Sequence, residues 1–309
     1  MIGILCGRNK ERLFADLVLK SAAFKTVPVL IFSMPDVNLS EKTVYGALIS
    51  GAEANIVKTT LPSHIYNFSV QHTKSHIKKL KQLLELENVT VYNPANSFNQ
   101  WSIMKILKSD AVSARYLFPF DNVTKGFDFR FEDSAGFILR PRNGNDPAKI
   151  TYCAKTKAGF DIYNIGEIAF GHLHDIRSAV NPIVKNGKWL VLFTPELTTY
   201  KNRLFTARGY LYKTKDKSWA LALKTVLSQT EETYGKTNDK PDEALIRMAA
   251  YVNNFIPDLA FCAIDFTLDK DGNPYFLALG GWQDLMPRKA LHKPLADVLC
   301  GSLASKHSE

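Results

Sequence analysis

The chain has 309 residues, a length that suits two ordinary domains or one large α/β unit. Hydrophobic residues make up 46% and charged residues 22%, fractions that are typical of a globular protein and exclude a disordered or collagen-like chain. No apolar stretch approaches the roughly 20 residues that cross a bilayer. Lys and Arg number 39 against 30 Asp and Glu, and the net charge of +9 favours an anionic partner such as a nucleotide, a nucleic acid or an acidic lipid.

The cysteines and the amino terminus indicate the compartment. The four cysteines lie far apart without CxxC spacing, which favours buried reduced thiols over disulfides or a metal site. The first residues lack the basic start, apolar segment and cleavage site of a signal peptide. We therefore expect a cytoplasmic protein.

The first hundred residues alternate between strand-like and helix-like segments. The strand-like segments are 2–6, 27–33, 63–67 and 89–92. A helix is expected inside each pair of strands, the second over 71–87, where leucines recur at helical spacing. This alternation predicts a parallel sheet covered by helices on both faces. The spacing of apolar residues over 96–117 then predicts one or two helices.

From about residue 125 the pattern changes to short β-like runs separated by turns. These runs predict a small antiparallel unit, and they are 136–140, 149–154, 159–165 and 189–193. A helix is expected over 172–184. Beyond it we expect a strand pair at 203–212 and 219–223, an amphipathic helix at 243–256, and a hairpin of 261–268 with 275–279 through an Asp-Gly turn.

Several kinds of chemistry find little support in the residues. There is no GxSxG nucleophile motif, and His172 and His174 stand two apart without further zinc-ligand spacing. The basic clusters are not interleaved with aromatic residues, as a platform for single-stranded nucleic acid would require. A nucleic-acid-binding protein therefore rests on net charge alone.

Three sequence phrases in a fixed order carry a more specific signal. They are FILRPRNGN at 137–145, RLFTARGYL at 203–211 and AIDFTLDKDGNPYFLALGG at 263–281. In this order the chain resembles the ATP-grasp superfamily, and within it the YheC/YheD group associated with bacterial endospore coats. The phrases VYNPANSFNQWSIMKIL at 91–107 and HKPLADVLCGSLA at 292–304 add to the likeness. The resemblance implies an N-terminal α/β domain over 1–95 and an ATP-grasp region over 96–309, with a small β-rich lobe at about 126–195.

The resemblance also implies a chemistry. ATP-grasp enzymes hold ATP between two β-rich lobes with Mg²⁺, and form an acyl-phosphate from a carboxylate, which an amine or thiol then attacks. Arg208 matches an arginine that reaches the phosphates in this chemistry and is the candidate catalytic residue, although Thr206 stands where the family has an aspartate. The positions that the resemblance places around the nucleotide are Arg140, where lysine is usual, Arg142, Asn143, Gly144 and Lys149 near the phosphates, and Phe193 and Thr194 beside the adenine.

The departures from the family pattern concern the metal. Asp265 matches the first Mg²⁺ ligand, but Ala278 and Gly280 stand where the family has a glutamate and an asparagine. A hard dication prefers several oxygen ligands, so one carboxylate would leave it held mainly by water and phosphate. Gln100 likewise replaces a lysine of the spore-coat group.

These departures leave two main hypotheses open. One is a weak or non-catalytic nucleotide-binding or structural protein, and the other is an active ATP-dependent carboxylate-amine ligase. A purely structural role is the alternative for the arginines, in which Arg140 and Arg208 form ion pairs with Glu132, Glu196 or Asp265.

Overall fold

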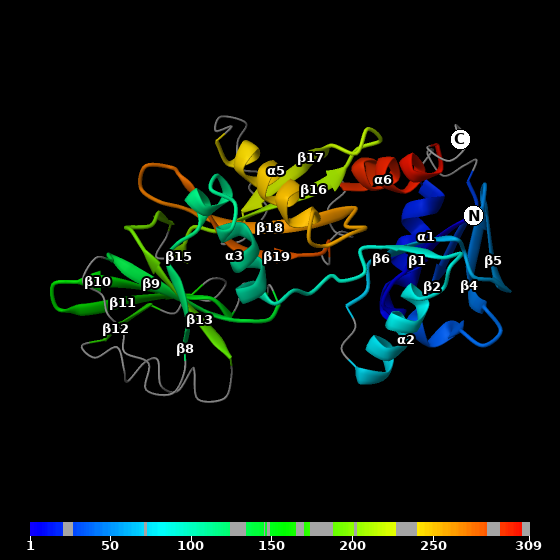
Figure 1. Ribbon diagram of the computed structural model, residues 1–309, viewed down its shortest axis with the longest axis horizontal. Helices are drawn as coiled ribbons and strands as arrows, with labels where there is room; N and C mark the ends of the chain where they lie inside the picture. Colours follow the sequence, from blue (N-terminus) through cyan, green and yellow to red (C-terminus); the bar gives the residue numbers. More distant parts are fainter. Residues whose placement is uncertain are drawn as a thin grey trace.

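Three main sheets follow one another along the chain in a computed structural model (Figure 1). The structure describes residues 1–20, 27–70, 73–123, 134–144, 146, 149–164, 170–173, 188–200, 203–226, 240–282 and 291–304. The N-terminal sheet lies at one end of the long axis, the sheet of β8–β13 lies at the other, and the sheet of β16–β19 lies between them. Among the described helices, none is long and apolar enough to cross a membrane.

The N-terminal sheet is mixed. Its parallel strands are β2 (Val29–Phe32), β1 (Ile2–Leu5), β6 (His64–Asn67) and β7 (Thr90–Tyr92), in that spatial order. The predicted strands do pair in parallel. The sequence did not predict the antiparallel extension beyond β2, which is formed by β3 (Val37–Asn38), β4 (Thr43–Ser50) and β5 (Glu53–Thr60). The turn between β4 and β5 contains Gly51 at φ +63°, a conformation that glycine adopts without strain.

Helices cover both faces of this sheet, as the sequence predicted. Helix α1 (Glu11–Lys20) packs Phe14, Leu17 and Val18 against one face, and α2 (Lys74–Leu84) packs Leu80 and Leu83 against the other. Between α1 and β1 lies the 3-10 turn η1 (Arg8–Lys10), and η3 (Met34–Asp36) follows β2.

The second sheet is antiparallel throughout and forms a small lobe. Its strands, in spatial order, are β12 (Phe170–Leu173), β11 (Gly159–Asn164), β10 (Thr151–Thr156), β9 (Gly136–Pro141), β13 (Trp189–Thr194) and β8 (Phe120–Val123). The helix expected over 172–184 was wrong at its start, since residues 170–173 pair with β11 as a strand. The rest of that expected helix, 174–184, lies outside the described residues.

The central sheet has four antiparallel strands. They are β17 (Trp219–Val226), β16 (Ala207–Lys213), β18 (Phe261–Leu268) and β19 (Pro274–Gly280), in that order. The short pair β14 (Thr199–Tyr200) and β15 (Arg203–Leu204) leads into β16 from the small lobe. The expected hairpin of 261–268 with 275–279 is therefore confirmed as β18 and β19.

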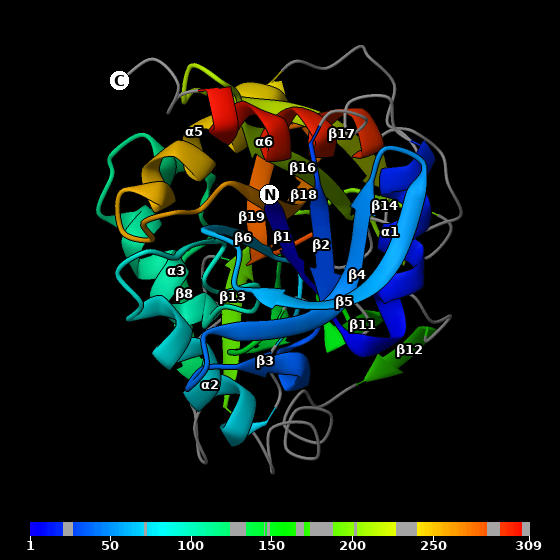
Figure 2. The same ribbon diagram turned by 90° about the vertical axis from the view of Figure 1, so that its right-hand side faces the viewer.

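The two faces of the central sheet have different neighbours. Cys262, Ile264 and Phe266 of β18 pack into a cluster with α3 (Gln100–Lys108), η4 (Ser113–Tyr116) and α5 (Lys240–Asn253). Because side chains alternate along a strand, Phe261 and Ala263 lie on the other face, where they pack with the N-terminal sheet and with α6 (His292–Ala304). Figure 2 shows α6 beside the N-terminal strands, and the Tyr66 hydroxyl donates to the Val298 carbonyl of α6 at 3.1 Å.

Candidate functional site

A row of four residues crosses the central sheet on the face that α5 does not cover. In the strand register, Thr225 lies opposite Arg208, Arg208 opposite Asp265, and Asp265 opposite Ala278. Directly opposite residues of an antiparallel pair point to the same face. Gly280, two residues beyond Ala278, lies opposite Ala263 and shares this face. Strand pairing therefore brings together Arg208, Asp265 and the two positions where the family resemblance expects further metal ligands.

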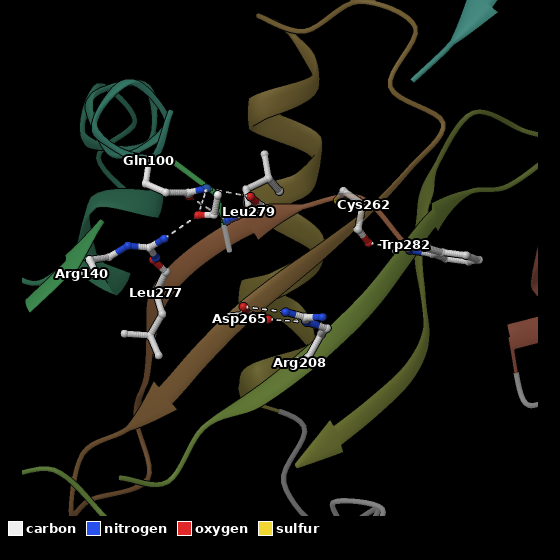
Figure 3. A network of polar contacts seen from close by, with 9 residues as sticks. Gln100, Arg140, Arg208, Cys262, Asp265, Leu277, Leu279 and Trp282 are labelled. Carbon is white, nitrogen blue, oxygen red and sulfur yellow. Dashed lines mark hydrogen bonds and ion pairs between the residues drawn. The ribbon is translucent and has the colours of Figure 1, made fainter. Parts of the chain in front are cut away.

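Arg208 and Asp265 form a buried, bidentate ion pair (Figure 3). The Arg208 Nε donates to Asp265 Oδ1 at 2.6 Å, and an outer guanidinium nitrogen donates to Oδ2 at 3.0 Å. The two side chains are only 7% and 2% exposed. Removing one partner of a buried pair leaves the other charge uncompensated, so each holds its partner in place. The sequence left open an ion pair of Arg208 with Glu132, Glu196 or Asp265. The structure contains the ion pair with Asp265.

Two buried hydroxyl groups flank Arg208, and sequence reasoning missed both of them as site residues. Thr206 comes two residues before Arg208, and Thr225 lies opposite it on β17. Both are at least nine-tenths buried, and their Oγ1 atoms have no hydrogen-bond partner among the described residues. Buried hydroxyls without partners are uncommon, because each costs free energy of desolvation. The sequence contains no signal for Thr225, whose place beside Arg208 follows from the register of β16 and β17.

Arg140, on β9 of the small lobe, reaches across to the central sheet. Its guanidinium donates to the Leu277 carbonyl of β19, to the Gly144 carbonyl at 2.8 Å and to the Pro141 carbonyl at 3.2 Å. Only 1% of the residue is exposed, and burial lowers the pKa of Arg140 to about 10, while the Asp265 charge acts in the opposite direction. Arg140 therefore lies within electrostatic reach of the ion pair and makes its described hydrogen bonds to neutral carbonyl groups.

Gln100, the first residue of α3, caps the outer edge of β19 beside Arg140. Its side-chain Nε2 donates to the Leu279 carbonyl at 2.8 Å, and its Oε1 accepts from the Leu279 N–H at 2.9 Å. The same Nε2 approaches the Gly144 carbonyl at 3.1 Å. Gln100 is fully buried. Gln100 thus links α3, the loop after β9 and the edge of the central sheet.

The remaining candidates near the phosphates lie on the loop after β9. Asn143 accepts from the Asn99 side chain at 3.1 Å, and Gly144, at φ +80°, donates its N–H to the Phe98 carbonyl at 3.2 Å. This part of the loop is therefore held against the start of α3.

Arg142 and Lys149 make their contacts away from the ion pair. The Arg142 guanidinium lies over the Trp101 ring at 5.9 Å, and the Lys149 ammonium is 3.7 Å from Asp146 on the surface. Of the predicted phosphate residues, Arg208 pairs with Asp265, and Arg140 lies at the outer edge of β19 within electrostatic reach of the Asp265 carboxylate.

Phe193 and Thr194 end β13, where the chain leaves the small lobe for the central sheet. The Phe193 N–H donates to the Pro119 carbonyl at 2.8 Å, and the Thr194 carbonyl accepts from Ala135 at 3.0 Å. Thr194 is 1% exposed and Phe193 is partly buried. Both lie at the junction of the two lobes, where the family resemblance places the adenine.

Asparagine side chains join the N-terminal sheet to the same face of the central sheet. The Asn93 side-chain Oδ1 accepts from the N–H groups of Ala260 and Phe261 at 2.8 and 3.1 Å, and its Nδ2 donates to the Phe261 carbonyl. The Asn96 backbone carbonyl accepts from Gly281 at 3.0 Å. Sequence reasoning gave Asn93 no role and considered Asn96 only as a cap of the following helix, whose N-cap in the structure is Asn99.

The described residues do not fit the Mg²⁺ that the fold family implies. Both oxygens of Asp265 accept hydrogen bonds from Arg208, and the residue opposite is Ala278. Within the described residues, no group of three His, Cys, Asp or Glu side chains is arranged to hold a metal. Asp269 accepts from the N–H groups of Asp271 and Asn273 at 2.9 and 2.8 Å, and so stabilises the turn between β18 and β19.

The fold is that of known ATP-grasp ligases. D-alanine–D-alanine ligase from Coxiella burnetii superposes on this chain with a TM-score of 0.54 and 9% sequence identity. The match covers 99% of this chain and 96% of the ligase chain. The ATP-grasp ligase PsnB, complexed with minimal precursor, gives 0.55 at 13% identity over 96% of this chain and 97% of its own. N5-carboxyaminoimidazole synthetase from Staphylococcus aureus, complexed with ADP, gives 0.54 at 10% identity over 97% of this chain and 77% of its own. No protein-family model and no curated protein matches the sequence. The predicted α/β ATP-grasp fold is therefore confirmed.

Proposed function

We propose that this chain is a nucleotide-binding protein of the ATP-grasp fold, of the YheC/YheD type, that does not catalyse ligation. The similar structures include one complexed with ADP, which supports nucleotide binding by this fold. In this proposal the N-terminal domain covers 1–95 and the ATP-grasp region covers 96–309. The nucleotide lies between the small lobe of about 126–195 and the central sheet, with its adenine near Phe193 and Thr194.

The Arg208–Asp265 ion pair is the observation that supports a protein without ligase activity. The acyl-phosphate route implied by the resemblance needs Mg²⁺ to neutralise charge that develops on the phosphates. The carboxylate that would ligate the metal is instead saturated by a guanidinium at 2.6 and 3.0 Å, and its cross-strand neighbour Ala278 offers no oxygen. A protein that cannot hold the metal ion loses the several kcal/mol of transition-state stabilisation that such an ion supplies, on the order of magnitude expected for a Lewis acid.

An active carboxylate-amine ligase is the second candidate, and the nature of the similar structures favours it. These proteins are ligases and synthetases, and they superpose over nearly all of this chain. In such an enzyme Asp265 would have to leave Arg208 when Mg²⁺ and ATP bind.

Calorimetry and thermal melting of the full chain with ATP, ADP and Mg²⁺ test the proposal. We expect nucleotide to raise the Tm, and we expect no release of ADP or phosphate from ATP in the presence of mixed carboxylates and amines. Absence of any shift at millimolar nucleotide contradicts the binding half of the proposal. Mg²⁺-dependent turnover of ATP that is lost in an Asp265→Asn variant contradicts the non-catalytic half and supports the ligase.

A further inference from the structure

We propose that a surface patch of aromatic and basic side chains on α3 and β8 binds single-stranded nucleic acid. This α3–β8 patch comprises Trp101, Lys105 and Lys108 of α3, Phe120 of β8, and Arg142 from the loop after β9. The contacts that define the patch lie on the small lobe and α3 and do not include the Arg208–Asp265 pair. The inference therefore goes beyond the proposed nucleotide site.

At this place the fold interleaves aromatic and basic side chains from separate segments of the chain. The rings of Trp101 and Phe120 meet edge to face, with their centroids 5.2 Å apart. The Lys105 ammonium lies 4.9 Å from the centre of the Trp101 ring, and the Arg142 guanidinium lies 5.9 Å from the same centre. The Lys108 ammonium lies 5.7 Å from the centre of the Phe120 ring. Two adjoining rings are thus accompanied by three cations.

The patch reaches the surface. Residues 101, 105 and 108 follow the spacing of one helix face, and both lysines are exposed, whereas the two rings are partly buried. Phe120 lies opposite Leu192 and so points to the face of the small sheet that packs against α3. The next residue, Asp121, lies opposite Val191 and points to the other face, so its carboxylate is directed away from the patch.

The positive charge of the patch is not matched by carboxylates. In the described part of the chain, the side chains of Lys105, Lys108 and Arg142 contact aromatic rings and form no ion pair. Asp110, two residues beyond Lys108, pairs with Arg247 instead. The Arg142 Nε is buried without a hydrogen-bond partner among the described residues, so it keeps one donor for a ligand. In a chain of net charge +9, three such cations favour a polyanion.

The aromatic rings favour nucleic acid over other polyanions. Sites for single strands combine cations that follow the phosphates with rings on which the bases stack. The contact of a solvated ammonium with a ring is weaker than the stacking of a base on that ring. We therefore expect Lys105 and Lys108 to leave the rings for phosphates when a strand binds, and bases to take their place. An acidic peptide would use the cations alone.

The first test measures the binding of a fluorescent oligothymidylate of about 15 nucleotides by anisotropy, at about 50 to 200 mM salt. We expect K105A/K108A to reduce the slope of log affinity against log salt by about 1.4, which is about 0.7 for each phosphate contact. The matched control is K78A/K81A on α2, where the two exposed lysines have the same spacing and no aromatic contact among the described residues, and its slope should stay that of the parent. Equal reductions in the two variants would show attraction by net charge alone and overturn the proposal, as would absence of binding at the lowest salt.

The second test concerns the stacking. Trp101→Leu keeps an apolar side chain at a partly buried position and should weaken binding by about tenfold, with an unchanged salt slope, because the phosphate contacts remain. Tyr45→Leu, at an aromatic residue of β4 that is 54% exposed, is the control and should bind as the parent does. The lysine variant, changed only at exposed positions, decides the question if Trp101→Leu does not fold. Parental affinity in a folded Trp101→Leu overturns the stacking. Polyglutamate that displaces the strand as well as unlabelled oligothymidylate does overturns the proposal in favour of an acidic protein partner.

Discussion

The side-chain amide of Gln100 pairs with both backbone polar groups of Leu279, in the way that one more strand would pair with β19. Strand β19 is the edge of the central sheet, and an edge strand leaves a row of unpaired N–H and C=O groups. Gln100 and Arg140 satisfy these groups at Leu279 and Leu277. The small lobe, α3 and the central sheet are therefore joined through backbone hydrogen bonds of β19.

Gln100→Ala should destabilise the protein. The change leaves the Leu279 N–H and carbonyl buried without their partner, and the expected loss in the free energy of unfolding is about 2–4 kcal/mol. Denaturant unfolding with an unchanged m-value measures it. Gln82→Ala, the same change at an exposed position of α2, is the control and should have little effect. A loss at Gln100 no larger than at Gln82 would show that the capping of β19 contributes nothing to stability.

The Arg208–Asp265 pair should show strong energetic coupling. Arg208→Met and Asp265→Asn each leave a buried partner unsatisfied, and each should cost about 3–5 kcal/mol of unfolding free energy. The double variant should cost less than the sum, with a coupling of about 2 kcal/mol in a double-mutant cycle. The exposed pair of Lys58 and Glu41, 2.6 Å apart, is the control and should show little coupling. Additive losses at Arg208 and Asp265 would mean that the pair is not the feature that stabilises this face.

Gly281→Ala should destabilise the junction between the N-terminal and central sheets. A Cβ at residue 281 would lie 2.2 Å from the Asn96 Oδ1 and 2.7 Å from its Cβ, so Asn96 would have to move. Asn96 also donates to the carbonyls of Asn67 and Ser69, and these bonds would be strained or lost. We expect a loss of about 1–3 kcal/mol, measured by denaturant unfolding. Gly7→Ala, where the added atom would meet only a flexible Asn9 side chain at 3.2 Å, should be tolerated far better.

The sequence predicted the elements of the fold better than the contacts of its site. Alternating apolar residues and the Asp-Gly turn were sufficient for β18 and β19, because local patterning decides such a hairpin. Family phrases placed Arg208 and Asp265 in one site, but their direct pairing depends on a strand register that joins residues 57 positions apart. Thr225 and Gln100 depend on pairings that no local pattern encodes. The antiparallel extension by β3–β5 was missed for a related reason, since β5 is mostly exposed and carries no clear apolar alternation.

The buried thiols should make the protein less stable at alkaline pH. Cys6, Cys153 and Cys262 are free and buried, as the sequence predicted for them, and burial raises the pKa of Cys6 and of Cys153 from 9.0 to about 12. Above pH 9 the unfolded chain loses these protons while the folded chain keeps them, so stability falls as the pH rises through the window from 9 to 12. Each thiol contributes a slope of up to about 1.4 kcal/mol per pH unit. Cys153→Ala should reduce the slope of unfolding free energy against pH between 9 and 10.5, and an unchanged slope would show that the Cys153 thiol does not cause the loss of stability.

Replacing Ala278 and Gly280 should convert this face into a metal site. In A278E/G280N the new carboxylate lies opposite Asp265 and the new amide lies opposite Ala263, all on one face of the sheet. Without metal, two neighbouring carboxylates repel each other, although Arg208 offsets part of that repulsion, so the variant should be less stable than the parent in EDTA. Oxygen ligands from three side chains suit Mg²⁺, so millimolar Mg²⁺ should raise the Tm of the variant and leave that of the parent unchanged. Conservative A278Q/G280N, which adds similar volume without the charge, is the control and should gain a much smaller Mg²⁺ shift. A variant that melts at the same temperature with Mg²⁺ and with EDTA would show that these positions do not converge on a common ligand.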